Sequence, residues 1–308
     1  MRAMFKIGII ISLIYGIVFL MPIVEAAIPT KKITPLFTLT KAGKQALSKP
    51  SDIAVNADRI YVVDGDNNRI VIYNKQGQYI SQFGKFGKRK GEFNYPVGIG
   101  LDTDGNVYVA DTKNHRIQIF DEDGDYEKMI KTEAGGEPVR PVDISVSSDK
   151  SKIYVTTKVN KILIYKRNGK KIKEIGKTGK ERGEFRFPAT ITNMSSGRFG
   201  VIDVLNFRLQ VFSSKGKFSY QVGDFGVRPG LFIRPKGVAI APDRKIYISD
   251  SYMDLIQVFS GKGHFLYVLG DKGKPHKVTA PGGIAIDKKK RLYVSEVYAN
   301  RISVFQLE

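Results

Sequence analysis

A repeat of about 46 residues runs through most of this 308-residue chain and restricts the possible folds more than any other feature. Prolines mark the starts of six units, 45 to 47 residues apart: Pro50, Pro96, Pro141, Pro188, Pro235 and Pro281. A mostly acidic column follows 14 or 15 residues after each proline: Asp64, Asp111, Thr156, Asp203, Asp250 and Glu296. A mostly basic column stands five residues further on: Arg69, Arg116, Lys161, Arg208, Leu255 and Arg301. Repeats of this length with short apolar runs are typical of β-propeller blades.

Each of the first five units contains four short apolar runs, which predict four strands. In the second unit the first three runs are residues 97–101, 106–110 and 117–120, and residues that favour tight antiparallel turns separate them. The last unit ends after its third run, whereas residues 34–40 have the apolar alternation of a fourth strand. We therefore predict an all-β, six-bladed propeller of four-stranded antiparallel blades over residues 33–308, with its last blade closed by the N-terminal strand.

The second unit resembles the NHL repeat family. The resemblance rests on residues 96–102 (PVGIGLD), 107–111 (VYVAD) and 114–120 (NHRIQIF), and on the lead-in GEFNYP at 91–96, which returns as GEFRFP at 183–188. It extends in phase over the six units, although Thr156, Lys161 and Leu255 depart from its charged columns. The resemblance implies the propeller fold, but the family includes ligand-binding and RNA-binding propellers, extracellular sensor domains and a few lyases. It therefore implies no single chemistry.

The first 26 residues have the pattern of an export signal. Arg2 and Lys6 precede the uncharged apolar run 7–24, and small residues follow it. We expect cleavage after Ala26, with residues 27–32 as a short linker to the propeller. Because the apolar run is long enough to cross a bilayer, an uncleaved membrane anchor through residues 7–24 is the alternative. In both cases we expect an exported protein that is periplasmic, extracellular or anchored facing outward.

The composition of the chain indicates the kind of partner it attracts. With 50 basic and 30 acidic residues, its formal net charge is +20. Such a field attracts polyanions without selecting among them. We expect an acidic protein, a glycan or another polyanion of the cell envelope as the partner, a monomeric protein and no cofactor. RNA binding agrees with the charge but conflicts with export.

The residue before each start proline forms a column of alternating cations and aromatics. Residues before proline favour extended backbone. We expect this column around one mouth of the central channel, where the outer strand of one blade connects to the inner strand of the next. Cations interleaved with aromatic rings suit polyanions with planar or sugar groups. The alternative is that the aromatics pack between blades and the cations are solvated. The candidate ligand-binding residues are Lys49, Tyr95, Arg140, Phe187 and Arg234 of this column, with Ala280 as its sixth member, and the loop cations Lys85, Lys88, Arg89 and Lys90.

Three further sets of residues could carry chemistry. Asp52 and Asp143 share one column of the innermost strand and could face the channel, but two acids on non-adjacent blades are few for an oxygen-ligand cation. We interpret the acidic and basic columns as pairs that fix a loop, since partly buried charges need partners. The histidines fall at unrelated repeat positions, which disfavours a zinc site: His115, His264 and His276.

We therefore expect a non-catalytic binding or scaffold propeller that offers a basic surface to an anionic partner. The competing hypothesis is a metal-dependent lyase or lactonase that acts at the central channel, with Asp52 and Asp143 as metal ligands.

Overall fold

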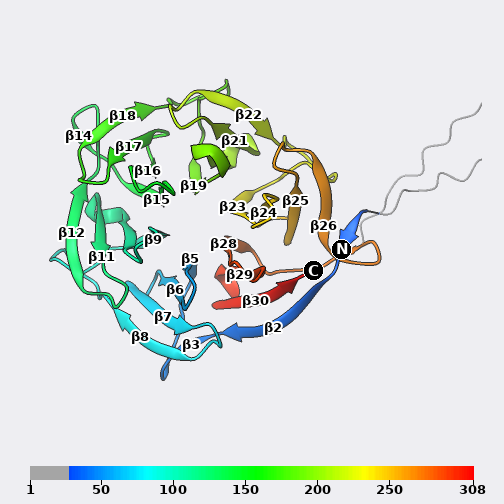
Figure 1. The fold of residues 1–308 in the computed structure, drawn as a ribbon, viewed down its shortest axis with the longest axis horizontal. Helices are drawn as coiled ribbons and strands as arrows, with labels where there is room; N and C mark the ends of the chain where they lie inside the picture. The colour runs from blue at the N-terminus through cyan, green and yellow to red at the C-terminus, as the bar shows by residue number, and fades with distance from the viewer. Residues whose placement is uncertain (1–27) are drawn as a thin grey trace, which may run out of the picture.

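The computed structural model describes residues 28–308, which form a ring of six four-stranded antiparallel sheets around a central channel (Figure 1). The predicted all-β, six-bladed architecture is confirmed. The helical segments of the described residues are four short 3-10 turns: η1 (Thr112–Asn114), η2 (Ser195–Gly197), η3 (Val204–Asn206) and η4 (Val297–Ala299). The predicted export signal, residues 1–26, and its alternative as a membrane anchor through residues 7–24 lie outside the described residues. Within residues 28–308 there is no helix with the length and hydrophobicity needed to span a bilayer.

Each blade runs from an inner strand beside the channel to an outer strand at the rim of the ring. The strands of the first three blades, from the channel outward, are β5 (Pro50–Val55), β6 (Arg59–Asp64), β7 (Arg69–Asn74) and β8 (Tyr79–Phe83); β9 (Pro96–Leu101), β10 (Val107–Asp111), β11 (Arg116–Phe120) and β12 (Tyr126–Lys131); β15 (Pro141–Val146), β16 (Lys152–Thr157), β17 (Ile162–Lys166) and β18 (Lys171–Ile175). Those of the last three are β19 (Pro188–Asn193), β20 (Phe199–Asp203), β21 (Arg208–Phe212) and β22 (Phe218–Val222); β23 (Pro235–Ile240), β24 (Ile246–Asp250), β25 (Leu255–Phe259) and β26 (Phe265–Asp271); β28 (Pro281–Ile286), β29 (Arg291–Glu296), β30 (Arg301–Leu307) and β2 (Ile33–Leu39). Short additional strands extend the connecting loops: β3 (Lys41–Ala42) with β4 (Gln45–Ala46), β13 (Glu133–Ala134) with β14 (Glu137–Pro138), and β27 (Lys274–Pro275) with β26.

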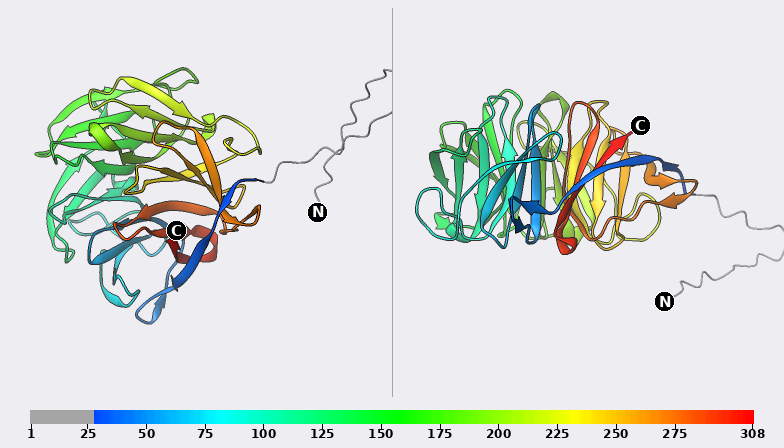
Figure 2. Two further views of the ribbon diagram at one scale, coloured as in Figure 1. Left: turned by 45° about the vertical axis from the view of Figure 1, so that its right-hand side comes forward. Right: turned by 90° about the horizontal axis from the view of Figure 1, so that it is seen from below.

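The N-terminal segment contacts two blades. Strand β2 pairs antiparallel with β30, with Ile33 opposite Leu307, and the side view shows it running along the edge of the disc (Figure 2). Before it, β1 (Thr30–Lys31) pairs in parallel with β26 of blade five. These two residues lie within the segment 27–32 that we expected to be a linker. The sixth sheet thus contains strands from both ends of the described chain.

The hydrophobic core lies between the blades. Buried side chains form six clusters, and each cluster is shared by two neighbouring sheets. Tyr61 of blade one shares a cluster with Phe93 and Phe120 of the second unit. Tyr293 of blade six shares another with Tyr73 of blade one. Because the last interface is built like the others, the closed ring covers both faces of every sheet.

Candidate binding site at the channel mouth

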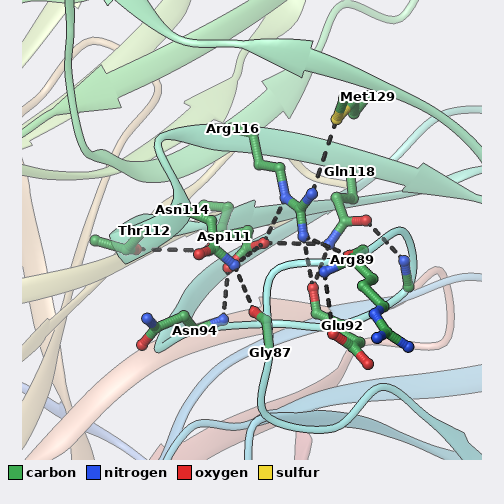
Figure 3. A network of polar contacts seen from close by, with 12 residues as sticks. Gly87, Arg89, Glu92, Asn94, Asp111, Thr112, Asn114, Arg116, Gln118 and Met129 are labelled. Carbon is green, nitrogen blue, oxygen red and sulfur yellow. Dashed lines mark hydrogen bonds and ion pairs between the residues drawn. The ribbon is translucent and has the colours of Figure 1, made fainter.

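A buried ion pair ties the turn between the second and third strands of a blade to the loop that enters that blade. In blade two, Asp111 accepts hydrogen bonds from Arg116 Nε and from the backbone N–H of Asn94, both at 2.7 Å (Figure 3). Through Nη2, Arg116 donates to the backbone carbonyls of Arg89 at 2.7 Å and Glu92 at 2.8 Å. Both charged side chains are buried. The pair therefore holds the entering loop in one conformation.

The same pairing recurs around the ring and confirms our interpretation of the two charged columns. The other pairs are Asp64 with Arg69 at 2.7 Å, Asp203 with Arg208 at 3.1 Å and Glu296 with Arg301 at 2.7 Å. In blade three, Lys161 pairs instead with Glu174 at 2.8 Å. These contacts form a rigid frame for the loops on one face of the disc.

A cavity of about 300 Å³ lies at the channel mouth on this loop-bearing face, and all six blades contribute to its lining. A second cavity of about 280 Å³ is lined by the far ends of the inner strands, toward the opposite face. Asp52, Asp143 and Thr190 line both. These three residues therefore lie between the two halves of the channel.

The structure places some of the predicted ligand-binding column at this mouth. Tyr95, Phe187 and Arg234 line the cavity, together with Ala280. Lys49 and Arg140 are outside its lining. The Lys49 ammonium instead pairs with the carboxylate of Asp66 at 2.8 Å, and both groups are partly exposed.

The backbone of this column differs from the extended form that we predicted. Four of its members have φ between 43° and 62°: Lys49, Tyr95, Phe187 and Ala280. A side chain of the preceding blade accepts a hydrogen bond from each of their N–H groups at 2.8 Å, and the acceptors are Asn300, Asn68, Asn160 and Asp254 respectively. These caps favour the left-handed conformation over the usual preference of a residue before proline.

Three cations at the mouth have no carboxylate partner. Within residues 28–308, the side chains of Lys158, Arg234 and Lys236 make no ion pair, although all three line the cavity. The Lys236 ammonium lies 5.4 Å from the centre of the Phe187 ring. Burial lowers the pKa of Lys236, and the charge of neighbouring Arg234 lowers it further. An anion in the cavity would raise the pKa of Lys236 again, because a nearby negative charge stabilises the ammonium.

Our sequence analysis did not identify Lys158 or Lys236. Lys236 follows a start proline, at a position where the other units have Ser51, Val97, Val142, Ala189 and Gly282. A single charge in a column of small and apolar residues was the signal that could have identified it. Lys158 has no comparable signal, because it lies in a turn where exposed charges are common.

The floor of the cavity is acidic. Asp52 on β5 and Asp143 on β15 are both buried, and each bridges to the next blade: Ile99 N–H donates to Asp52 at 3.0 Å, and Ile191 N–H donates to Asp143 at 2.8 Å. Burial raises the pKa of both carboxyls, that of Asp52 to about 7. Although their blades are not adjacent, both carboxyls contact the same dipeptide of blade two: Asp52 accepts from Ile99 N–H, and Asp143 Oδ1 lies against the position that a Cβ at Gly98 would take.

The other predicted cations form a separate group on the loop into blade two. The Lys85 ammonium is 3.8 Å from the Glu92 carboxylate, and the Lys90 ammonium lies 5.5 Å from the centre of the Tyr126 ring on the outer strand β12. None of the loop group lines the channel cavity: Lys85, Lys88, Arg89 and Lys90. The predicted ligand-binding residues thus divide into a channel-mouth set and a rim set.

The histidines do not converge. None of His115, His264 and His276 lines either channel cavity, and the His276 ring packs edge-on against Phe305 with 5.1 Å between ring centres. In the part of the chain that the structure describes, no three His, Cys, Asp or Glu side chains are grouped so that they could hold a metal ion. Asp52 and Asp143 alone would be a sparse ligand set.

The ring of sheets and its channel cavity define a six-bladed β-propeller. The sequence pattern of the NHL repeat matches residues 47–73 and 93–120, so the chain carries NHL repeats in this propeller. Protein brain tumor from Drosophila melanogaster is 28% identical over 131 residues, which is 42% of this chain and 12% of that protein. The match therefore spans a small part of that relative.

Solved structures show the same fold at low sequence identity. A structural genomics protein from Bacteroides thetaiotaomicron is 12% identical with a TM-score of 0.68, over 91% of this chain and 75% of that chain. Virginiamycin B lyase from Staphylococcus aureus is 15% identical with a TM-score of 0.62, over 92% of this chain and 97% of the lyase. A streptogramin B lyase is 17% identical with a TM-score of 0.59, over 83% of this chain and 78% of that enzyme. These similarities concern the fold alone.

Proposed function

We propose that this protein is a non-catalytic, extracytoplasmic binding propeller whose channel-mouth cavity holds an anionic group of an acidic protein, a glycan or another polyanion. One observation carries the proposal: three cations without carboxylate partners line a cavity that also has aromatic walls. Unpaired cations in a concave site concentrate anions. The rings of Tyr95 and Phe187 offer flat apolar faces to a planar or sugar group.

The charge of the whole chain and the predicted export signal support this proposal. A net charge of +20 brings polyanions to the surface, and the cavity then selects the group that enters it. The rim set, with Lys88, Arg89 and Lys90, would extend the contact with a polymeric anion.

Retention on immobilised heparin tests the proposal. A variant with Arg234→Glu and Lys236→Glu should elute at distinctly lower salt than the wild type, because the cavity loses its cations. A second variant, with Lys88→Glu, Arg89→Glu and Lys90→Glu, measures the contribution of the rim set.

The matched control combines Lys288→Glu with Lys289→Glu. These exposed lysines lie in the turn between β28 and β29, on the opposite face, and their reversal changes the net charge as much as the Arg234 and Lys236 pair does. If this control lowers the elution salt as much as the channel-mouth variant, total charge governs retention and the proposal is wrong.

The competing hypothesis, a metal-dependent lyase or lactonase, has less support from the site. One structural neighbour is a catalytically inactive virginiamycin B lyase, with a histidine replaced by alanine, in complex with Quinupristin. The histidines of this chain lie outside both channel cavities. Metal analysis of the purified protein tests the hypothesis, since a stoichiometric cation that is lost in Asp52→Ala would support it.

A further inference from the structure

The two buried acids approach one segment of blade two, since Asp52 accepts from Ile99 N–H and Asp143 Oδ1 lies against Gly98. Asp52 belongs to blade one and Asp143 to blade three, and the inner strand β9 between them has Gly98 at the same level. A Cβ atom at Gly98 would collide with Asp143 Oδ1, and one at Gly283 would collide with Asp52 Oδ1. The two glycines therefore leave the space that the carboxyl groups occupy.

Neither acid has a cation to stabilise its charge. Both carboxyls accept hydrogen bonds from backbone groups: Ile99 N–H donates to Asp52, and Ile144 N–H and Ile191 N–H donate to Asp143. Among residues 28–308, neither carboxylate has a basic group within ion-pair distance. Two neighbouring buried carboxyls in this setting do not both ionise easily, so the pair retains a proton at a pH where exposed carboxyls have lost theirs.

The charged groups around the pair are few. The inner strands packed against it, β9, β19 and β28, present Gly98, Thr190 and Gly283 at its level. Above it, the cavity contains three cations and the phenols of two tyrosines: Lys158, Arg234, Lys236, Tyr95 and Tyr298. The cations attract an anion toward a floor whose own charge depends on the proton of the pair.

We propose that the channel cavity takes up its anionic group together with a proton, and that the Asp52–Asp143 pair holds this proton. The ligand group is a carboxylate, phosphate or sulfate carried on a planar or sugar body. This inference rests on the proposed function. A bound anion adds negative charge beside the pair and raises its affinity for a proton, and by linkage loss of the proton weakens anion binding. The protonated carboxyl can also donate a hydrogen bond to the anion.

Calorimetric titration with a heparin hexasaccharide tests this inference, because its sulfates stay ionised throughout the pH range used. Titrations at pH 7 in two buffers of different ionisation heat measure the protons taken up on binding. Because a site with a pKa of about 7 is half protonated at pH 7 before the ligand binds, we expect an uptake of about half a proton per site there. The affinity should be about tenfold weaker at pH 8 than at pH 6, in proportion to the protonated fraction of the free site. The full chain is used throughout.

Variants separate the acid pair from the lysine of the cavity. Asp52→Asn and Asp143→Asn each replace a carboxyl with a neutral amide, so both should bind at pH 6 and lose most of the pH dependence. Lys236→Arg should keep the pH dependence of binding, because arginine remains charged. If this variant loses the pH dependence, the titrating group is Lys236 and not the acid pair. Circular dichroism confirms that each variant is folded.

The outcomes distinguish this inference from the proposed function. Binding without proton uptake, at equal affinity at pH 6 and pH 8, overturns the inference and leaves the binding function intact. Binding that is absent at both pH values overturns both.

Discussion

The side chain of Asn300 accepts a hydrogen bond from the backbone N–H of Lys49, with 2.8 Å between Oδ1 and N, and so joins the last blade to the first across 251 residues of chain. Asn68 and Asn160 make the same contact with Tyr95 and Phe187 of their following blades. The junction between the last and the first blade is therefore capped in the same way as these two other blade junctions.

Asn300→Gly should lower the free energy of unfolding by about 1 kcal/mol, the usual contribution of one hydrogen bond. Glycine keeps the left-handed backbone of this position, where φ is 53°, so the change isolates the side-chain bond. The matched control is His115→Gly, since His115 has the same φ of 53° in blade two. Its side chain makes no hydrogen bond among residues 28–308, and its replacement should not destabilise. Urea unfolding measures both; equal losses would contradict this role of Asn300.

Asp111→Ala should be among the most damaging single changes, with a loss of about 3 to 5 kcal/mol, as expected when one partner of a buried ion pair is removed. It leaves the buried guanidinium of Arg116 without its carboxylate. Lys161→Met is the comparison, because Lys161 pairs with Glu174 where both are partly exposed; it should cost less than about 1 kcal/mol. Thermal unfolding measures the stability lost in each variant. A smaller loss for Asp111→Ala than for Lys161→Met would contradict the stabilising role of the buried Asp111–Arg116 pair.

The contribution of the acid pair to the free energy of unfolding of the ligand-free protein should fall as pH rises from about 4 to 7. Burial raises the pKa of Asp52 to about 7, so in this window the folded protein binds a proton that the unfolded chain has released. Relative to the wild type, Asp52→Asn should therefore gain stability between pH 5 and pH 8, by at most about 1.4 kcal/mol per pH unit. Urea midpoints across this range give the difference, and parallel curves would argue against a shared proton.

Gly84→Ala should destabilise more than Gly91→Ala on the same loop. Both glycines have left-handed φ, 90° and 75°, so both substitutions cost about 1 to 2 kcal/mol of backbone strain. A Cβ at Gly84 would in addition overlap the buried ring of Phe93, whereas nothing lies within 4 Å of one at Gly91. Overpacking of this kind adds about 1 to 3 kcal/mol. A difference near zero in urea unfolding would show that the loop relaxes away from the ring.

Much of the local structure could be predicted from the sequence because each repeat copy reports the same pattern. The inner strand predicted at residues 97–101 is β9 (Pro96–Leu101), and the pairing of Asp111 with Arg116 followed from their fixed spacing. The extended backbone predicted at Tyr95 was wrong, because the preference of a residue before proline is only a local effect. The cap from Asn68, a residue of the preceding blade, opposes it.

By itself, the sequence determined the number of blades and the order of their strands, since each repeat unit can bury its two faces only against its neighbours. Only the tertiary structure decided which side chains meet in the channel. Asp52 and Asp143 lie 91 residues apart, and both reach the Gly98–Ile99 segment because the ring places blade two between their blades. Lys236 faces the same cavity from blade five. Their meeting depends on the curvature and closure of the ring, which no local pattern contains.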